Sequence, residues 1–536
     1  MEANMVPSIL YPESPGEVPA PLKPDERERL AGDLNLDQVF EAVNSGREDL
    51  DLLPLFYSPL TSLDQVAYRH EVLADFERPP VMDVVKAFGQ EMSHSRVILS
   101  TARSLHNRWQ EKRLFVDAVS VYCKAVSGLA TGLSELRPSS RGLQALTGYV
   151  CTYQSSPGFQ ELVDGGQEVV RALKAVRYGL HIRPPRVTVL EYQGEPDYAK
   201  EVEEFFAKFR EGAVKDFTAK LADPLDMNQV DGRVLDLIAR LNPGPFERLD
   251  RYFERHQGFQ DPVVTSFERD SQFYLSYLEY IGPLRAGGLG LCYPRLFSAT
   301  GQARLHGLFD LALAAKLSER SPDGAGTAAN GPERSRRVSD GAGVVTNDLE
   351  LRPGERIVVV TGPNSGGKTT YARAMGQVHY LASLGLPVPA RDANLVLADA
   401  VFTSFEQTEQ LDKARSHLED ELIRLHEVVE RASARTVVIM NESFSSTTLR
   451  DAAVLGKAVL NQLLACGALC LFVTFVDELA AANDATVSVA ATVDPADPTV
   501  RTYNFVRKPP EGRAYAAALA ERYGLNYRAV EEQMTA

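Results

Sequence analysis

The stretch TGPNSGGKTT at residues 361–370 has the spacing G-x-x-x-x-G-K-T. The β-branched run RIVVV precedes it at 356–360, and a stretch with helical character follows it at 371–385. This order of strand, glycine-rich loop and helix predicts a phosphate-binding loop, because glycines let backbone N–H groups close around phosphate oxygens. We expect the phosphates of ATP to contact Gly362, Pro363, Asn364, Ser365, Gly366, Gly367, Lys368, Thr369 and Thr370.

Two side chains of this loop have predicted chemical roles. The ammonium group of Lys368 neutralises the terminal phosphates, and the hydroxyl of Thr369 is a ligand for Mg²⁺. The positive end of the following helix adds to the attraction for phosphate. We therefore predict ATP and Mg²⁺ as cofactors.

A second apolar run, TVVIM at 436–440, ends in Asn441 and Glu442. A carboxylate at the end of such a strand can orient and deprotonate the attacking water, so Glu442 is the predicted catalytic base beside Lys368. Asn441 stands where phosphate-binding proteins usually have an aspartate. Its amide oxygen can accept a hydrogen bond from a metal-bound water, but without a negative charge it should bind Mg²⁺ more weakly.

The C-terminal half has the pattern of an α/β domain. A third β-rich run, LCLFVT at 469–474, alternates with helical stretches, which favours a mainly parallel sheet flanked by helices. We predict an ABC-like P-loop NTPase domain over 291–536. Its insert at 319–342 has few large apolar side chains and is predicted to be disordered, and the RSRR within it either contacts an acidic partner or DNA or is simply solvated.

The N-terminal half is dominated by helical periodicity. Apolar residues recur at three- and four-residue steps between 202 and 217, and a short strand is predicted at 186–192. Residues 1–30 are rich in Pro and Glu and predict a flexible arm, which leaves a mostly α-helical domain over 31–290.

These motifs together resemble one family. TGPNSGGKTT is similar to the TGPNMGGKST loop of MutS-type DNA mismatch-repair ATPases, and the resemblance covers about 340–530. Further matches occur in the family's order: VVTNDLEL (344–351) with its PND segment, LPVPA (386–390) with VPA, NESFSSTTLRDA (441–452) with DEIGRGTSTYDG, VTFVDEL (473–479) with ATHYFEL, and EGRAYAAALAERYGL (511–525) with SYGIQVAKLAGL.

The resemblance implies a dimeric ATPase whose two ATP sites are each completed by the partner subunit. Ser416 matches the serine that contacts the γ-phosphate of the partner's ATP, and Glu421 matches the acid that follows it. Ser416 and Glu419 also have the spacing of an S-x-x-E capping box. Phe475 replaces the histidine of the family's ATH motif, which alters a switch position. The region 31–290 resembles the helical core and lever, and residues 140–230 form either a reduced DNA clamp or an extension of that core.

We expect no mismatch-reading domain, since its Phe-x-Glu wedge has only a chance match at residues 159–161. The predicted function is a slow ATP hydrolase that acts as a homodimer and couples its ATP state to DNA binding. We expect it in the cytoplasm and not in a membrane. It would be related to mismatch repair or recombination. The alternative is a nucleotide-dependent dimerisation switch that acts on a protein partner, which the net charge of -15 favours.

Overall fold

The computed structural model describes residues 7–12, 19–183, 186–194, 229–298, 303–319, 343–406, 417–497 and 500–510. These residues form two compact units, which are described separately. The described residues of the first unit come from 1–76, 139–142 and 269–536, and those of the second unit from 77–138 and 143–268.

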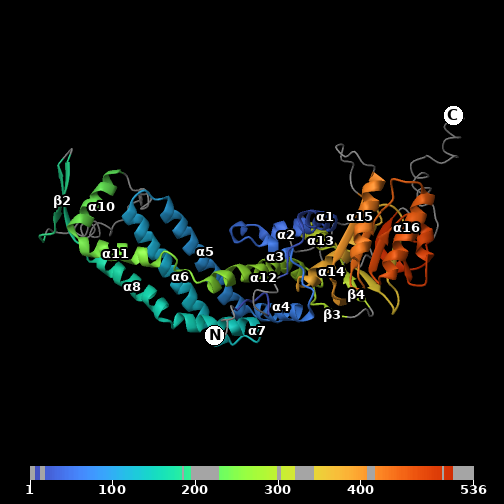
Figure 1. Cartoon of the computed structure of the whole chain (residues 1–536), viewed down its shortest axis with the longest axis horizontal. Helices are drawn as coiled ribbons and strands as arrows, with labels where there is room; N and C mark the ends of the chain where they lie inside the picture. The colour runs from blue at the N-terminus through green and yellow to red at the C-terminus, as the bar shows by residue number, and fades with distance from the viewer. Residues whose placement is uncertain are drawn as a thin grey trace, which may run out of the picture. The chain divides into compact units, whose positions relative to one another are not determined.

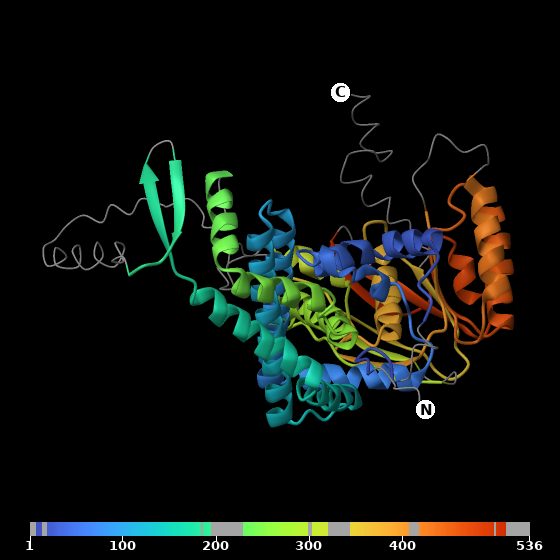
Figure 2. The ribbon, with the colours of Figure 1, turned by 60° about the vertical axis from the view of Figure 1, so that its left-hand side comes forward.

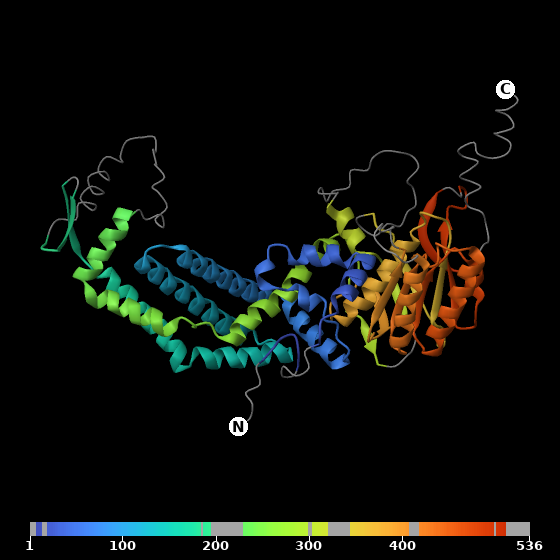
Figure 3. The same cartoon turned by 45° about the horizontal axis from the view of Figure 1, so that its top comes forward.

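Long helices make up most of the second unit. Helices α5 (Pro79–Ser104) and α6 (Arg108–Leu136) run side by side (Figure 3), and α8 (Pro157–Lys174) and α11 (Pro243–His256) pack against α6. The unit also contains most of α7 (Arg141–Gln154), α10 (Gln229–Leu241) and the beginning of α12 (Pro262–Ala286). The predicted helical character of this half of the chain is confirmed.

Helix α6 begins at a side-chain cap. The side-chain oxygen of Asn107 accepts hydrogen bonds from the backbone N–H groups of Trp109 and Gln110, at 2.9 and 3.2 Å. This cap satisfies donors that the first turn of a helix leaves without partners. Trp109, the single tryptophan of the chain, is 6% exposed and packs edge-to-face against Phe246, with ring centroids 4.9 Å apart.

Within the described residues, α6 is the one helix whose length and hydropathy would suffice to cross a bilayer. Its apolar side chains are buried inside the second unit: Tyr122, Val126, Leu129 and Leu133 are each at most 1% exposed. The hydropathy of α6 is therefore that of a helix in the core of a protein unit.

A β-hairpin follows α8 in the second unit (Figure 2). Strands β1 (Tyr178–Arg183) and β2 (Arg186–Glu191) are antiparallel, with Tyr178 opposite Glu191 and Arg183 opposite Arg186. β2 confirms the predicted strand at 186–192. Because side chains alternate along a strand, Tyr178, Leu180 and Ile182 share one face, where they are 42%, 43% and 68% exposed.

A six-stranded sheet forms the centre of the first unit (Figure 1). Its strand order is β12-β11-β6-β10-β9-β8, and every neighbouring pair is parallel except β11 with β12. The strands are β6 (Ile357–Thr361), β8 (Val401–Phe405), β9 (Val437–Asn441), β10 (Leu469–Val473), β11 (Thr486–Val493) and β12 (Arg501–Arg507). The predicted strands are β6, β9 and β10, and the predicted mainly parallel sheet is confirmed.

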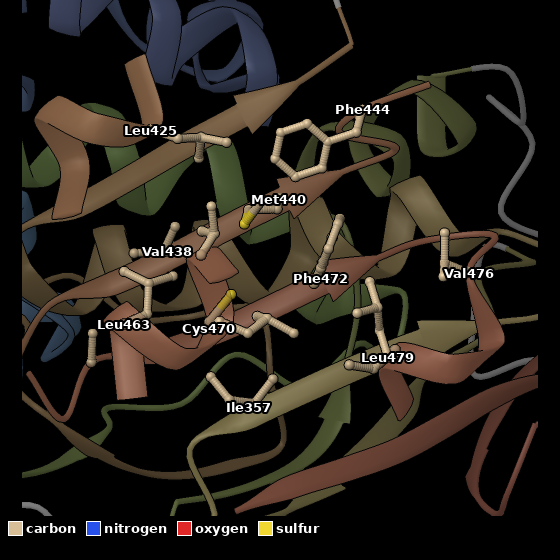
Figure 4. Packing of buried hydrophobic residues seen from close by; sticks show 14 of the residues in the cluster. Ile357, Leu425, Val438, Met440, Phe444, Leu463, Cys470, Phe472, Val476 and Leu479 are labelled. Carbon is tan, nitrogen blue, oxygen red and sulfur yellow. The ribbon is translucent and has the colours of Figure 1, made fainter. Parts of the chain in front are cut away.

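Helices cover both faces of this sheet. Helix α14 (Lys368–Ser383) contacts β8, β9 and β10, while α15 (His417–Arg431) and α16 (Leu449–Ala465) pack on a shared apolar cluster. Figure 4 shows Met440 of β9 and Phe472 of β10 in that cluster, together with Leu425 of α15. Since side chains alternate, Asn441 lies on the other face of β9 from Met440, which is the face that α14 covers.

A second sheet, of four strands, completes the first unit. Its order is β3-β7-β4-β5, and it is mixed, because β3 is parallel to β7 whereas β4 is antiparallel to both β7 and β5. The strands are β3 (Arg295–Phe297), β4 (Arg304–Leu308), β5 (Asn347–Glu350) and β7 (Asp392–Val396). Helix α13 (Leu311–Glu319) follows β4 directly, so this sheet places α13 beside the phosphate loop.

The N-terminal segment differs from the prediction of a flexible arm over 1–30. Helix α1 (Pro24–Leu34) begins inside that range. It is followed by α2 (Leu36–Asn44), the 3-10 helix η1 (Glu48–Leu50), α3 (Leu53–Phe56) and α4 (Leu63–Phe76). A second 3-10 helix, η2 (Asp477–Ala481), lies in the C-terminal part of the chain. The end of α1 packs on α14: Arg373 Nε donates to the carbonyl of Asp33 at 3.0 Å, and Gln377 Nε2 to that of Leu34 at 2.8 Å. Proline at the first helical position and these long-range contacts outweigh the composition of the segment.

The boundary predicted at residue 290 also differs from the observed grouping. Residues 31–76 and 269–290 belong to the same compact unit as the sheet domain. One reason is that Tyr380 Oη donates to the carbonyl of Phe56 at 3.0 Å, and the N–H of Leu60 to the carbonyl of Ser383 at 2.7 Å. Residue 319 ends α13. The predicted disorder at 320–342, the helix at 202–217 and the match at 511–525 lie outside the described residues.

Candidate functional site

The loop between β6 and α14 has a backbone that glycine permits. Gly362 and Gly367 have φ values of +129° and +85°, in the region that side chains disfavour. A Cβ atom on Gly362 would also lie 2.8 Å from the Cβ of Ala491. Ser365 adopts a φ of +59° as well, which is unfavourable for a residue with a side chain.

The side chain of Lys368 is fixed by hydrogen bonds within the loop. It is 6% exposed, and its Nζ donates to the carbonyls of Gly362 and Pro363, at 2.9 and 3.2 Å, and to Asn364 Oδ1 at 3.3 Å. Burial of the ammonium group lowers the pKa of Lys368, and the negative charge of Glu442 opposes this effect. The loop therefore positions a cation whose three donors are all directed to neutral acceptors.

A cavity of about 490 Å³ adjoins the loop. One part is lined by the loop residues Ser365 to Thr370 and by Glu442, which brings the predicted catalytic base and lysine to one site. The rest is mostly apolar, and the residues that line it are Leu308, Phe309, Asp310, Leu313, Leu317, Gly343, Val344, Val345, Asn347, Tyr371, Ala374, Tyr503 and Phe505. Such a combination of an apolar pocket and a phosphate loop suits a nucleotide.

The apolar part of the cavity was not predicted from the sequence. Asn347 of β5 joins it to β12, because its Oδ1 accepts from the N–H of Phe505 at 2.8 Å and its Nδ2 donates to the carbonyl of Tyr503 at 3.1 Å. The ring of Phe505 stacks on that of Tyr371, with centroids 4.4 Å apart. Asn347 lies within the segment VVTNDLEL and was the one available signal; the aromatic residues of β12 come from more than 150 residues later in the chain.

Glu442 follows β9 at a sharp change of backbone direction. It has a φ of +56°, and its N–H donates to the carbonyl of Val473 at 2.9 Å. Its side chain is half-buried and lines the cavity. Two residues later, Phe444 also has a positive φ, of +66°, and its N–H donates to Glu421 Oε2 at 3.0 Å.

Asn441 lies at the last position of β9 and is 6% exposed. Within the described part of the chain, its Oδ1 is buried and has no hydrogen-bond partner. Asn441 is on the face of the sheet that α14 covers, and Thr369 is in the first turn of α14. A buried oxygen without a partner and a hydroxyl fit Mg²⁺, which takes oxygen ligands and retains several of its waters.

Of the predicted positions that the structure describes, Asn441 and Phe475 are not among the residues that line this cavity. Phe475 follows β10 and is 48% exposed, and its ring has no polar atom with which to contact a phosphate. Ser416 lies outside the described residues, so its contact with a partner subunit stays a prediction. Gly362, Pro363 and Asn364 hold Lys368 and do not line the cavity themselves.

A comparison with protein families matches this region. Residues 358–533, which begin in β6 and include the phosphate loop, Asn441 and Glu442, match the family model of MutS domain V. Residues 358–533 belong to the MutS family. The resemblance predicted from the sequence is thereby confirmed.

Curated MutS-family proteins are similar to this chain over about a quarter to a third of its length. An endonuclease MutS2 from Gemmatimonas aurantiaca is 29% identical over 198 residues, which are 36% of this chain and 24% of the relative. The DNA mismatch repair protein Msh3 from Mus musculus is 33% identical over 131 residues, 24% of this chain and 12% of the relative. The DNA mismatch repair protein MutS from Granulibacter bethesdensis is 33% identical over 135 residues, 25% of this chain and 15% of the relative. The matches thus span no more than about a quarter of the length of these relatives.

Proposed function

We propose that this chain binds ATP and Mg²⁺ and hydrolyses the ATP slowly. One observation carries the proposal: Lys368, the glycine loop and Glu442 all border a single cavity of about 490 Å³ whose remaining walls are largely apolar. The apolar walls suit a base and ribose, and the loop suits phosphates. The carboxylate of Glu442, directly after β9, suits the activation of water.

The residues of the chain would act as follows. The ammonium group of Lys368 exchanges its bonds to the carbonyls of Gly362 and Pro363 for bonds to the terminal phosphates. Backbone N–H groups of the loop and of the first turn of α14 hold the remaining phosphate oxygens. The carboxylate of Glu442 orients the attacking water and accepts its proton.

Bound Mg²⁺ supplies charge neutralisation between the terminal phosphates. Thr369 would hold it directly through its hydroxyl, and Asn441 through a water that donates to Oδ1. Because an amide oxygen carries no net charge, we expect a higher Mg²⁺ requirement and slow turnover.

The test is ATP turnover by the wild type and by Glu442→Gln, which preserves side-chain size and removes the base. Hydrolysis should fall by about 100-fold or more, within the range of general-base catalysis, while ATP binding is retained. Lys368→Ala should instead abolish ATP binding. Equal turnover by the wild type and Glu442→Gln would refute the assignment of the base.

We further propose that the chain acts as a homodimer and couples its ATP state to DNA binding. The homodimer and the coupling are what the sequence resemblance implies, and a role on DNA agrees with relatives that are named DNA mismatch repair proteins. The hairpin β1–β2 in the second unit lies within the region predicted as a reduced clamp. His181, Arg183 and Arg186 are exposed on it, and Arg183 and Arg186 face each other across the two strands. Cations on such a projecting hairpin can contact phosphates despite the acidic total charge.

The DNA proposal is tested by the salt dependence of binding to duplex, branched and mismatched DNA. Arg183→Ala and Arg186→Ala should each weaken binding and reduce the slope against the logarithm of salt concentration by about 0.9 for each lost phosphate contact. Lys457→Ala, an exposed cation of α16, is the matched control. Absence of salt-sensitive binding to all three DNAs, with and without ATP, would refute the proposal.

A second candidate function is a nucleotide-dependent dimerisation switch that acts on a protein. The observation in its favour is the other face of the same hairpin, where Tyr178, Leu180 and Ile182 are exposed. An exposed apolar face suits a protein partner better than DNA. ATP-driven dimerisation in sedimentation experiments, without turnover and without a response to DNA, would favour the switch.

A further inference from the structure

The backbone after β9 holds Glu442 in a conformation that needs support. Two of three successive residues, Glu442 and Phe444, have positive φ values of +56° and +66°. Neither is a glycine or an asparagine, so this conformation is unfavourable for the isolated chain. Contacts from elsewhere in the fold must therefore stabilise it.

Three kinds of contact hold this short loop. The N–H of Glu442 donates to the carbonyl of Val473 on β10 at 2.9 Å, and the hydroxyl of Ser443 donates to the carbonyl of Ser404 on β8 at 3.2 Å. The ring of Phe444 is 1% exposed and packs in the same apolar cluster as Leu425 (Figure 4). These contacts fix the loop to the neighbouring strands and to the core.

A further contact comes from an acidic side chain of α15. Oε2 of Glu421 accepts from the N–H of Phe444 at 3.0 Å, and Glu421 is 8% exposed. A carboxylate forms a stronger hydrogen bond than a neutral acceptor, and a buried backbone N–H is costly to leave without a partner. This bond therefore stabilises the second of the two unfavourable residues.

We propose that Glu421 is a positioning residue for ATP hydrolysis. By holding the N–H of Phe444, it keeps the backbone of 442–444 in place and so sets the carboxylate of Glu442 against the cavity. The inference rests on the proposed role of Glu442 as the base. A small displacement of a catalytic group, of about 1 Å, can cost about 100-fold in rate, so the support of this loop has a measurable effect.

Three substitutions separate the reach of the side chain from its charge. Glu421→Gln retains an acceptor oxygen at the same distance from the backbone but removes the charge. Glu421→Asp retains the charge, but its side chain is one methylene group shorter, so its oxygen lies farther from the N–H of Phe444. Glu421→Ala removes both the charge and the acceptor. Glu427→Ala is the matched control, because Glu427 is an exposed acid on the same helix.

The measurements are kcat, KM and ATP affinity for each variant, with hydrogen exchange at the Phe444 amide. Glu421→Ala and Glu421→Asp should lower kcat by about 10- to 100-fold, with ATP affinity within about twofold of the wild type. Glu421→Gln should recover most of kcat, and Glu427→Ala should retain all of it. The Phe444 amide should exchange faster in the Ala and Asp variants only.

A second arm tests whether Glu421 acts through Glu442. In a Glu442→Gln background, Glu421→Asp should cause little further loss of turnover, because the two effects are not independent. If Glu421→Ala does not fold, Glu421→Asp carries the test. Unchanged kcat and unchanged exchange at Phe444 in the Asp variant would overturn the positioning role. Wild-type ATP binding without turnover would instead overturn the proposed hydrolysis, whatever the exchange shows.

Discussion

Asn441→Asp should make the protein less stable without nucleotide and more sensitive to Mg²⁺ with it. Asn441 is 6% exposed, its Oδ1 has no partner among the described residues, and Glu442 is adjacent. A carboxylate introduced at this position would be desolvated and would lie next to another negative charge, so its pKa would be raised. Each unit of pKa elevation corresponds to about 1.36 kcal/mol.

The magnitude follows from that conversion. Buried carboxyl groups shift by up to about 3 to 5 units, and the cation of Lys368, which interacts electrostatically with the adjacent Glu442, should offset part of the shift. Taking about 2 units gives about 2.7 kcal/mol of destabilisation at pH 8. Because the unfolding entropy is about 2.1 cal/mol/K per residue, the melting temperature of a unit of this size should fall by about 4 °C.

The pH dependence has a definite sign. A carboxyl group whose pKa is raised on folding destabilises the protein while it is ionised, so the deficit is present above the folded pKa. The deficit should shrink as the pH falls towards about 4, the value in the unfolded chain. Circular dichroism melts of the wild type and the variant at pH 5 and pH 8 measure this difference.

With ATP present, the same charge should become favourable. The Mg²⁺ concentration for half-maximal ATP binding should fall by about tenfold or more, which corresponds to about 1.4 kcal/mol. Asn441→Ala is the control, since it removes the oxygen without adding a charge, and it should show no pH-dependent deficit. Identical melts and identical Mg²⁺ titrations for the wild type and Asn441→Asp would refute the placement of Asn441 beside the metal.

Three further predictions concern packing and ionisation in the first unit. Gly376→Ala should lower the free energy of unfolding by about 1 kcal/mol, because its Cβ would lie 2.5 Å from the fully buried Leu34 and the strain exceeds the gain in helix propensity. In a Leu34→Ala background the same substitution should be stabilising. Destabilisation in both backgrounds, measured by thermal melts, would contradict this. Tyr371→Phe should raise stability without nucleotide by about 1 kcal/mol, because the buried hydroxyl has no partner among the described residues; a lower melting temperature would show that it has one. Burial raises the pKa of Asp270 to about 6, so stability should fall by about 2 kcal/mol as the pH rises from 4 to 6. Asp270→Asn should remove this loss, and a variant with the same pH profile as the wild type would exclude Asp270 as its cause.

The strand, loop and helix around Lys368 could be predicted because each depends on local sequence. The glycines fix the loop, and β-branched residues before it and helix formers after it fix its flanks. Helix α1 was missed because its stability comes from distant residues: Leu34 packs against Gly376, and Asp33 accepts from Arg373. A segment rich in Pro and Glu resembles a disordered one until such contacts are known.

The supporting residues of the candidate site were harder to find. Tyr503 and Phe505 join the cavity only because β12 lies at the edge of the sheet next to β11 and is tied to Asn347. Glu421 did carry a signal: it lies three residues after Leu418 and four before Leu425, on the apolar side of its helix. An acid at such a position needs a buried donor, but the sequence does not say that the donor is the N–H of Phe444.

The position of Trp109 has a practical consequence. It is the single tryptophan of the chain, it is buried in the helical second unit, and the candidate ATP site lies wholly within the first unit. Intrinsic fluorescence excited at the indole band therefore reports on the helical unit alone. If adding ATP shifts or quenches the emission of Trp109, then ATP binding in the first unit has changed the surroundings of a residue in the second unit. The native protein thus contains an intrinsic fluorescent probe for coupling between the nucleotide site and the helical unit.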